Sequence, residues 1–559
     1  MQQPDLPFRW RTFTAALIVL SVGFAVAWIV NPPVYSTNDD VSLRQALEGE
    51  TAPGEPATGF TLMTHAALGW PVAYLYRMAP VVPWWDLIVA GTLIWSLGVL
   101  VALVWDGVGN DWLARTLTVS LLLVAVAPLA VALQYTIGAT LAGAAALLLA
   151  VLELHSRRPV RRSVLLLAMV TLLGGLVVRT LGAVAGVVAA GVFLIPLMVG
   201  GALETRRVAM VVVASAVLAA AVQYADGLLY ALQPEWGRYY QYQWMIVRLF
   251  EWRGEPSDQA LDAIRAAAGW TRNDWRMVSG YFSVDPALHG YESVARVYEA
   301  STRLFGWQGW LSWAAERVRQ TDWRTVSTMV ERSAAPLVAM AGVAIAYPRW
   351  RGIAAIAGLG LLYLAFCVGV ETAFKELPSR LLAPFQAAVV AVALITASRF
   401  RREGSAARVV VGVAVVLSVL GPHLRENWTT AASMSADARA LDGEVREILR
   451  LSPSLVVLHA DTFRREYWWR PFHRPSIRLP AIALAWNNQN PLLQRFLQRS
   501  GRKGLLESMC SDPSVLVIAD EGRLDFVTTF FAEHRHEQIV WTPVYTGSFP
   551  AWRCSMVRS

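Results

Sequence analysis

Residues 13–30, FTAALIVLSVGFAVAWIV, form an apolar run without a charged side chain. A helix of about 17 to 25 such residues is long enough to cross the hydrocarbon core of a membrane. The rest of the chain has the same character, because 55% of its 559 residues are hydrophobic and only 16% are charged. Soluble domains carry roughly 25% charged residues. The sequence therefore predicts an all-α polytopic membrane bundle.

Ten further apolar segments follow residues 13–30 and have the length, or nearly the length, of a membrane span. The eleven predicted spans are residues 13–30, 86–105, 114–133, 137–153, 163–178, 180–200, 207–225, 334–347, 353–370, 381–398 and 408–420. The segments 334–347 and 408–420 are the shortest, so their ends are the least defined.

The arginines predict the orientation of the bundle, because cytoplasmic loops of membrane proteins are enriched in cations. With the N-terminus inside, fifteen arginines fall on the cytoplasmic side: Arg9, Arg11, Arg115, Arg157, Arg158, Arg161, Arg162, Arg206, Arg207, Arg349, Arg351, Arg399, Arg401, Arg402 and Arg408. Only three cations, Arg179, Lys375 and Arg380, fall in short external turns. The C-terminus is then outside. Residues 25–27 also resemble a signal-peptidase site, and cleavage there would leave ten spans with the loops on the same sides.

This topology divides the chain into four parts. An N-terminal transmembrane module, 1–225, carries the external loop 31–85, and a long external loop, 226–333, is predicted to be mainly helical. A C-terminal transmembrane module, 334–421, is followed by an external tail, 422–559, with the pattern of a small α/β domain. Its predicted strands are residues 454–459, 514–519, 538–545 and 552–557, and its predicted helices are 491–498 and 524–533.

The cysteines and the net charge restrict the function further. Cys510 and Cys554 share the external tail, where an oxidising compartment would permit a disulfide, whereas Cys367 lies in a predicted span and is expected to pack there. The net charge is +8, but the basic residues follow the topology and form no stripe that would bind nucleic acid. The sequence contains no P-loop, dinucleotide-binding fingerprint, zinc-ligand spacing or nucleophile elbow.

An acidic pair begins about eight residues after the first span. Asn38, Asp39 and Asp40 lie in the first external loop, close to a membrane surface, where one carboxylate could act as a general base and the other could bind a divalent cation. The alternative is that these residues form an Asx-turn or cap the N-terminus of a helix over 41–47.

The overall layout resembles the GT-C glycosyltransferases, membrane enzymes that include protein O-mannosyltransferases, aminoarabinose transferases and arabinofuranosyltransferases. The shared features are a cytoplasmic N-terminus, an acidic pair just after the first span, about eleven helices and an external C-terminal domain. The resemblance implies transfer of a sugar from a polyprenyl-phosphate donor to a glycan, lipid or protein acceptor, at the outer face of a bacterial inner membrane. By analogy with these enzymes, Asp40 is the preferred base. The mannosyltransferases carry a His-Pro-Pro-Leu element, whereas here His65 precedes Ala66, Ala67 and Leu68, so the sugar stays open.

The three external cations are candidate ligands of the donor phosphate. Lys375 and Arg380 lie between the ninth and tenth spans at headgroup depth, and Arg179 lies in a turn of almost no length. Cations at this depth can bind a polyprenyl phosphate, or they can simply extend to lipid headgroups. Asp39 or Asp40 is the candidate ligand of a divalent cation, Mg²⁺ or Mn²⁺.

Further polar residues are candidate donor or acceptor contacts. They are Asn38, Glu48, His65, Arg272, Asp274 and Trp275. The long loop that carries the last three could close over the reactants and exclude water, and solvated surface charge is the alternative for each of them. Aromatic residues at 239, 240, 242 and 244 offer faces suited to stacking on sugar rings or to packing in a core.

Three other functions stay open on sequence alone. A flippase or transporter is expected to carry inverted repeats and charged groups at mid-membrane, whereas here the spans are largely free of charge and about 300 residues lie outside. A polymerase of lipid-linked oligosaccharides would also work at the external face. A non-catalytic scaffold for envelope assembly would leave Asp39 and Asp40 replaceable.

Overall fold

The structure is a computed structural model of the whole chain. It describes residues 8–108, 132–156, 158–250, 258–305, 323–346, 350–373, 379–399, 439–459, 462–475, 477–484 and 487–557, with single residues between 309 and 321 and at 437. The predicted spans 408–420 and most of 114–133, as well as Lys375, lie outside the described residues.

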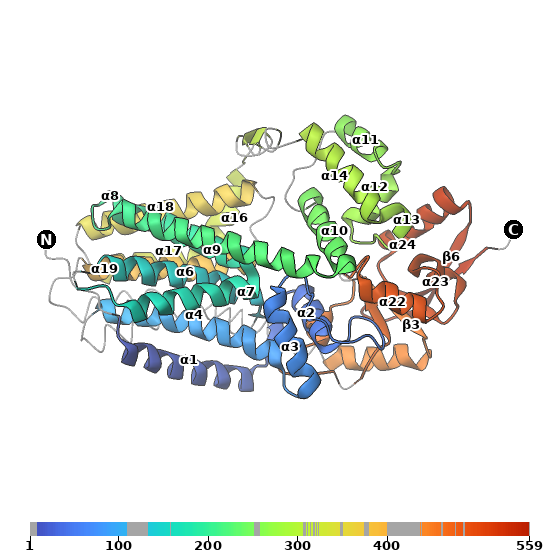
Figure 1. Cartoon of the computed structure of the whole chain (residues 1–559), viewed down its shortest axis with the longest axis horizontal. Helices are drawn as coiled ribbons and strands as arrows, with labels where there is room; N and C mark the ends of the chain where they lie inside the picture. Colours follow the sequence, from blue (N-terminus) through green and yellow to red (C-terminus); the bar gives the residue numbers. More distant parts are fainter. Residues whose placement is uncertain are drawn as a thin grey trace.

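Long apolar helices lie side by side and form the bundle in the left part of Figure 1. They are α1 (Trp10–Val30), α4 (Trp84–Val108), α6 (Tyr135–Leu154), α7 (Arg162–Phe193), α9 (Thr205–Ala231), α17 (Ala334–Ala346), α18 (Trp350–Ala373) and α19 (Ser379–Arg399), with the short α8 (Ile195–Val199) after α7. Within the described residues, six segments are long and apolar enough to cross a membrane. The number of spans and the side of each end stay predictions, and α17, with 13 residues, is shorter than a typical span.

The element α7 consists of two helices that meet at Arg179, whose backbone is extended (φ −158°, ψ 97°). Glycines let its second half approach α6 closely: a Cβ added to Gly186 would lie 1.9 Å from the Thr140 carbonyl oxygen. A Cβ on Gly175, in the first half, would lie 3.3 Å from the Cβ of Ala183 in the second half. The two halves therefore pack against each other as a hairpin, and the predicted break between residues 163–178 and 180–200 is present at Arg179.

The first loop and most of the long loop gather at one end of the bundle (Figure 1). The first loop forms β1 (Val34–Tyr35), α2 (Asn38–Glu48) and α3 (Ala66–Met78), and β1 pairs in parallel with β2 (Ala132–Leu133). The long loop is helical as predicted, with α10 (Pro234–Phe250), α11 (Asp258–Ala266), α12 (Arg272–Ser279), α13 (Pro286–His289), α14 (Tyr291–Phe305) and α16 (Trp323–Arg332).

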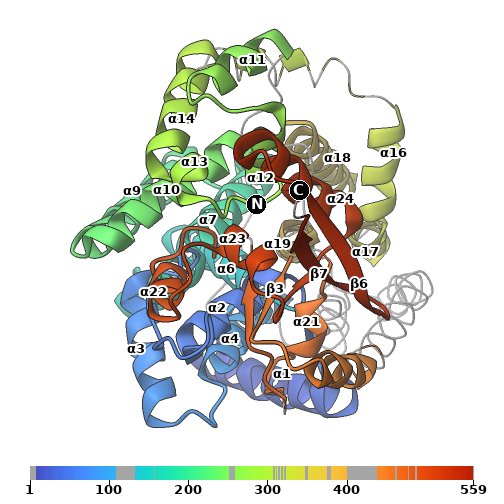
Figure 2. The same ribbon diagram turned by 90° about the vertical axis from the view of Figure 1, so that its right-hand side faces the viewer.

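The tail adds a five-stranded sheet of order β4-β3-β5-β7-β6 at the same end. Figure 2 looks onto this end and shows the sheet, in orange and red, beside the long-loop helices in green. Its strands are β3 (Leu455–Leu458), β4 (Ala481–Ala483), β5 (Val515–Ile518), β6 (Ile539–Thr546) and β7 (Pro550–Met556). Its helical elements are α21 (Arg465–Trp468), α22 (Pro491–Arg499), α23 (Leu505–Ser511), α24 (Glu521–Phe530) and a π-helical turn, Phe531–Arg535. The four predicted strands are present, and β4 was not predicted.

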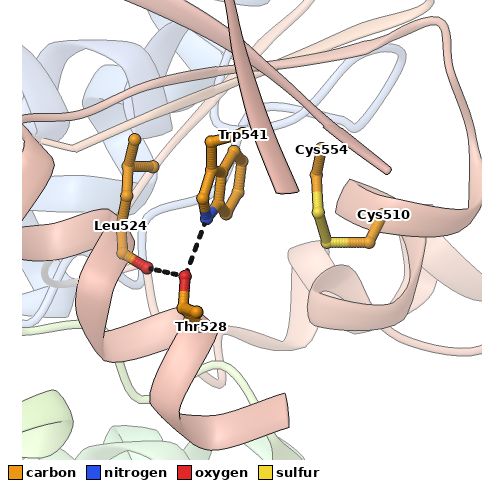
Figure 3. The surroundings of a disulfide bond; sticks show 5 residues. All are labelled: Cys510, Leu524, Thr528, Trp541 and Cys554. Carbon is orange, nitrogen blue, oxygen red and sulfur yellow. Dashed lines mark hydrogen bonds between the residues drawn. A yellow bond between two sulfur atoms is a disulfide. The ribbon is translucent and has the colours of Figure 1, made fainter. Parts of the chain in front are cut away.

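A disulfide joins Cys510 of α23 to Cys554 of β7, with the two Cα atoms 4.6 Å apart. Nearby, the Thr528 hydroxyl donates to the Leu524 carbonyl and accepts a hydrogen bond from the Trp541 indole (Figure 3). The disulfide thus ties β7 to α23, and the Trp541 hydrogen bond ties the edge strand β6 to α24. Cys367 is buried, as expected for a packing residue.

The first loop is part of the same hydrophobic core as the sheet. Val34, Tyr35 and Val41 belong to one buried cluster with Val456 of β3 and Leu516 of β5. Burial of apolar surface is the main stabilising contribution to such a junction. The helix that carries the acidic pair is therefore held between the bundle and the tail.

Candidate active site

Helix α2 places the acidic pair in its first turn. Thr37, just before the helix, has extended backbone, and Asp39 and Asp40 follow within the first turn, where carboxylates interact favourably with the helix dipole. They are therefore not N-cap residues. Gly49 ends the helix with φ 82°, a conformation that favours glycine, and a Cβ there would also meet the Ala57 amide nitrogen at 2.7 Å.

Asp40 is completely buried. Its Oδ1 accepts a hydrogen bond from the Tyr135 amide at 3.2 Å, and its Oδ2 accepts one from the Thr37 hydroxyl at 3.1 Å. Burial raises the pKa of Asp40 well above its ordinary value, because the charged form loses solvation. Asp40 thus fastens α2 to the start of α6. Our preference for Asp40 as the base changes accordingly, because this side chain has little access to a substrate.

Asp39 is the accessible member of the pair. Its Oδ2 lies 3.5 Å from a guanidinium nitrogen of Arg380, and the side chains of Asp39 and Arg380 keep 21% and 34% of their surface exposed. Arg380 is the second residue of α19. The structure therefore brings a predicted carboxylate and a predicted cation together from distant parts of the chain.

Arg179 lies near Tyr135, close to Asp39, Asp40 and Arg380. Its guanidinium donates to the Met63 carbonyl at 3.2 Å and lies 5.7 Å from the centre of the Tyr135 ring. The Tyr135 hydroxyl experiences the charges of Arg179, Arg380, Asp39 and Asp40. The break in α7 therefore delivers a second predicted cation to the neighbourhood of the acidic pair.

Asp39 faces a narrow pocket between α2, α10 and the tail. The pocket is lined by Asp39, Ser42, Leu43, Ala46, Phe60, Thr61, Leu62, Met63, Tyr239, Asn487 and Asn490. Asn487 and Asn490 supply amide groups, although the Asn487 Nδ2 already donates to the Ala483 carbonyl and the Asn490 Oδ1 already accepts from the Leu492 amide, and Tyr239 supplies an aromatic ring. The lining combines one carboxylate with neutral polar and apolar groups, and the pocket volume of about 20 Å³ holds about one water molecule. A larger polar ligand would therefore have to widen this pocket.

Arg465 is a buried cation beside this pocket. Its side chain is 1% exposed and donates to the Gln45 and Ser42 side chains on α2, each at 3.1 Å. Burial lowers the pKa of Arg465 to about 10, while the carboxylates of Glu466 and Asp39 oppose that shift. The guanidinium is therefore still protonated at neutral pH and adds positive charge near Asp39.

The predicted contact Glu48 belongs to a different network, at the far end of α2. Arg44 pairs with Glu48 at 2.7 Å and with Asp86 at 3.0 Å, and Arg474 pairs with Glu48 at 2.8 Å. The Tyr35 hydroxyl donates to Asp86. These groups are almost wholly buried, apart from Arg474 at 31% exposure. The network connects α2, α4 and the tail, and Glu48 is structural in it.

His65 also has a structural position. Its Nδ1 accepts a hydrogen bond from the Ala67 amide and caps α3, and its Nε2 lies 3.0 Å from the Val222 carbonyl. Asp226 of α9 lies 3.5 Å from Nδ1 and accepts from the Ala66 amide. His65 therefore fastens α3 to α9 and does not line the pocket of Asp39.

The long-loop residues Arg272, Asp274 and Trp275 do not join the pocket either. Asp274 is buried and accepts hydrogen bonds from His289 at 3.2 Å and His534 at 3.0 Å. Its pKa is held below its ordinary value: burial opposes this shift, and the bonds from His289 and the Thr271 amide outweigh it. Arg272 is exposed, and the Trp275 ring packs on Phe250. This cluster joins the long loop to the tail.

The donor set around Asp39 does not by itself fit a divalent cation. Such ions take about six oxygen ligands, but both oxygens of Asp40 accept protein hydrogen bonds and Asp39 pairs with Arg380. Across the described ranges, no three His, Cys, Asp or Glu side chains are grouped to hold a metal. The cation stays a prediction, and no chemical step is assigned to it below.

Several residues of the site were not predicted. Asn487 and Asn490 belong to the conspicuous run Asn487-Asn488-Gln489-Asn490, whose density of amides was the available signal. Tyr135 lies between two predicted spans and Arg465 within a basic stretch of the tail, and neither carries a sequence signal that would place it near Asp39. The packing of both α6 and the tail against α2 brings these residues together.

Fold and site together define a multi-spanning membrane protein with a small pocket where the bundle meets its extramembrane layer; the pocket is lined by one carboxylate, Asp39, which pairs with Arg380. No family model matches the sequence, and no curated protein matches it. The chain is similar to the crystal structure of ArnT from Cupriavidus metallidurans bound to undecaprenyl phosphate, with 13% identity, 97% of each chain covered and a TM-score of 0.37.

Proposed function

We propose that this protein is an integral membrane glycosyltransferase that moves a sugar from a polyprenyl-phosphate donor to a cell-envelope glycan, lipid or protein. The observation that carries the proposal is the contact between Asp39 and Arg380 beside a pocket lined by Asn487 and Asn490. Sugar transfer from a phosphate needs a base for the acceptor hydroxyl and positive charge for the departing phosphate. Asp39 and Arg380 offer these two functions side by side.

In this proposal Asp39 is the general base. The acceptor oxygen attacks the anomeric carbon of the sugar while Asp39 takes the proton of the acceptor hydroxyl. The bond between the anomeric carbon and the phosphate oxygen breaks, and the electron pair leaves with the polyprenyl phosphate. Asp40 then has a positioning role, because its hydrogen bonds to Thr37 and Tyr135 orient the first turn of α2.

Arg380 and Arg179 bind the phosphate of the donor. Arg380 stands at the start of an apolar helix, Arg380–Thr396, and so at the boundary between the apolar bundle and the extramembrane layer. A helix N-terminus favours an anion, and arginine matches the geometry of phosphate oxygens. Lys375, a few residues earlier, remains a predicted third cation.

Asn487, Asn490 and Tyr239 are the proposed sugar contacts. Amide groups can pair with sugar hydroxyls as donors and acceptors, and an aromatic ring can pack against the apolar face of a sugar. By the arginine distribution, this end of the bundle faces outward from a bacterial inner membrane. The donor and acceptor would then meet in the outer leaflet or just above it.

The test is transfer by the purified full-length protein in lipid nanodiscs, with a panel of radiolabelled polyprenyl-phosphate sugars and an envelope lipid and glycan extract as acceptor. Wild type is compared with Asp39→Asn and with Asp525→Asn, an exposed carboxylate on α24. We expect transfer to fall by about 10²- to 10⁴-fold in Asp39→Asn and to be unchanged in Asp525→Asn.

Equal transfer by wild type and Asp39→Asn would show that this carboxylate is not the base. Movement of intact donor across proteoliposome membranes, without cleavage of its phosphate–sugar bond, would replace the glycosyltransferase with a flippase.

A further inference from the structure

A second cavity lies between the ends of α1 and α4 and shares no lining residue with the pocket of Asp39. Its volume is about 640 Å³, within the range of small-molecule sites. The lining is mostly apolar and comprises Ala25, Trp28, Ile29, Pro32, Pro33, Leu87, Ala90, Gly91, Ile94 and residues 470–473. We call it the α1–α4 groove. Ile29 is 81% exposed and Leu87 48% exposed, so the groove opens sideways, toward where the hydrocarbon of a membrane would lie.

The end of the α1–α4 groove that lies next to the tail is cationic. Arg470 supplies the charge; His473 also lines this end, but burial together with the neighbouring Arg470 lowers the pKa of His473, so its imidazole is neutral at pH 7. The Nε of Arg470 is buried and has no hydrogen-bond partner among the described residues. Buried donors in native proteins normally have a partner. An apolar groove that ends at a guanidinium, one of whose nitrogens has no partner among the described residues, complements the shape and charge of a lipid with an anionic headgroup.

The segment that carries Arg470 is held firmly in place. The Arg44 guanidinium donates to the carbonyl oxygens of Arg470 and His473, each at 3.0 Å. Between them, Phe472 adopts φ 60°, a conformation that a large side chain rarely takes without support. That support comes from Asp86, which accepts from the Phe472 amide at 2.8 Å, and from Trp28, whose ring lies 5.2 Å from the Phe472 ring.

From these contacts we infer that the α1–α4 groove binds one anionic glycerophospholipid of the surrounding membrane, with an acyl chain along α1 and α4 and its phosphate on Arg470. A guanidinium and a phosphate form strong charge-assisted hydrogen bonds, and the apolar lining receives the chain. The inference is independent of the proposed function, because it involves neither Asp39 nor Arg380. The lipid would steady the segment 470–473, to which α2 is tied through Arg44.

The experiment is native mass spectrometry of the purified full-length protein, released from nanodiscs that contain equal amounts of phosphatidylglycerol and phosphatidylcholine. The blocking variant is Gly91→Leu, because a Cβ at Gly91 meets no atom within 4 Å and the larger side chain would occupy the groove. The matched control is Gly23→Leu on α1, where a Cβ also meets nothing within 4 Å but which does not line the groove. Arg470→Gln tests the headgroup contact. Thermal unfolding of each variant checks that it is folded.

We expect wild type and Gly23→Leu to retain one phosphatidylglycerol at least fivefold more often than phosphatidylcholine. Gly91→Leu and Arg470→Gln should each lower that retention at least fivefold. Equal retention of phosphatidylglycerol by wild type and Gly91→Leu would overturn the site, and equal retention of the two lipids by wild type would overturn its preference for an anion. If undecaprenyl phosphate, added in competition, displaces the phospholipid from wild type completely, the groove belongs to a polyprenyl lipid and the inference fails.

Discussion

Asp39 on α2 and Arg380 on α19 lie 3.5 Å apart, and both side chains are partly open to solvent. A pair of this kind contributes only about 0 to 1 kcal/mol to stability. Breaking this contact therefore costs little free energy. Arg380 could then bind a phosphate in the proposed reaction, and Asp39 could bind an acceptor hydroxyl. The buried pair of Arg44 and Asp86, by contrast, is closed on all sides and serves the fold.

Removing the charge of Arg380 should slow catalysis more than it weakens binding. We expect Arg380→Gln to lower kcat about 100-fold, because the guanidinium stabilises charge that develops on the leaving phosphate, and Arg380→Lys to recover part of that loss. The control is Arg303→Gln, since Arg303 pairs with Glu299 on the exposed surface of α14. Steady-state kinetics with the active donor separate the two effects. A rise in KM with unchanged kcat would mean that Arg380 only binds the ground state.

Asp40 should tolerate substitution by asparagine. The amide of Asp40→Asn can accept from the Tyr135 amide and donate to the Thr37 hydroxyl, so the geometry of α2 is kept. We expect its transfer rate to stay within about tenfold of wild type, in contrast to the predicted loss of about 10²- to 10⁴-fold for Asp39→Asn. A loss in Asp40→Asn as large as that in Asp39→Asn, at equal thermal stability, would return the base to Asp40.

The buried Asp40 carboxyl should make the stability of the protein depend on pH, and Asp40→Asn should remove this dependence. The pKa of Asp40 is raised in the folded protein by burial, whereas in the unfolded chain it is about 3.9. The neutral carboxyl thus contributes stability that is fully present below about pH 3.9 and is lost as pH rises toward the folded pKa. We expect Asp40→Asn to unfold at a higher temperature than wild type at pH 7.5 and at the same temperature near pH 4. Equal midpoints at both pH values in detergent would contradict the raised pKa.

Breaking the buried pair should destabilise the whole junction of first loop, bundle and tail. Asp86→Ala removes one of the two carboxylate partners of Arg44, which keeps Glu48, and removes the acceptor of the Tyr35 hydroxyl and the Phe472 amide. Each buried donor left without an acceptor costs about 1 to 3 kcal/mol. Thermal and denaturant unfolding measure this loss. Glu299→Ala, which breaks an exposed pair, should change stability by less than about 1 kcal/mol, and a similarly small effect of Asp86→Ala would refute the network.

Removing the disulfide should selectively weaken the tail. Cys510 and Cys554 are 44 residues apart, and the chain-entropy relation assigns a loop of this size about 4 kcal/mol. We expect Cys510→Ser with Cys554→Ser to increase hydrogen exchange in β5, β6 and β7 while the helices of the bundle keep their protection. Unchanged exchange in these strands would show that packing alone holds the sheet edge.

Much of the fold can be predicted from the sequence, because helices and strands produce patterns among neighbouring residues. Apolar runs predict the long helices, and the two runs on either side of Arg179 predict a hairpin whose close packing depends on Gly175 and Gly186. Alternating and β-branched stretches predict four of the five strands of the tail. The missing strand, Ala481–Ala483, is only three residues long, too short to produce a pattern.

The candidate site was predictable only in part. Arg380 and Arg179 stand out because cations are rare in the predicted external turns, and Asp39 stands out as part of an acidic pair after the first span. The structure gathers all three around Tyr135. Glu48, His65 and Asp274 look equally suitable in sequence, but each is consumed by a structural partner: Arg44, the Ala67 amide and two histidines, respectively. Whether a polar side chain can contact a substrate depends on which residues pack against it in the folded protein.

By itself, then, the sequence determined a helical membrane bundle with large segments outside the spans, because hydrophobic length and the placement of cations are properties of neighbouring residues. The tertiary structure alone decided that Asp40 is buried while Asp39 opens to a pocket, that Asn487 and Asn490 complete it, and that Arg470 ends an apolar groove. These assignments depend on burial and on contacts between residues hundreds of positions apart. Both arise only when α2 is enclosed between the bundle and the tail.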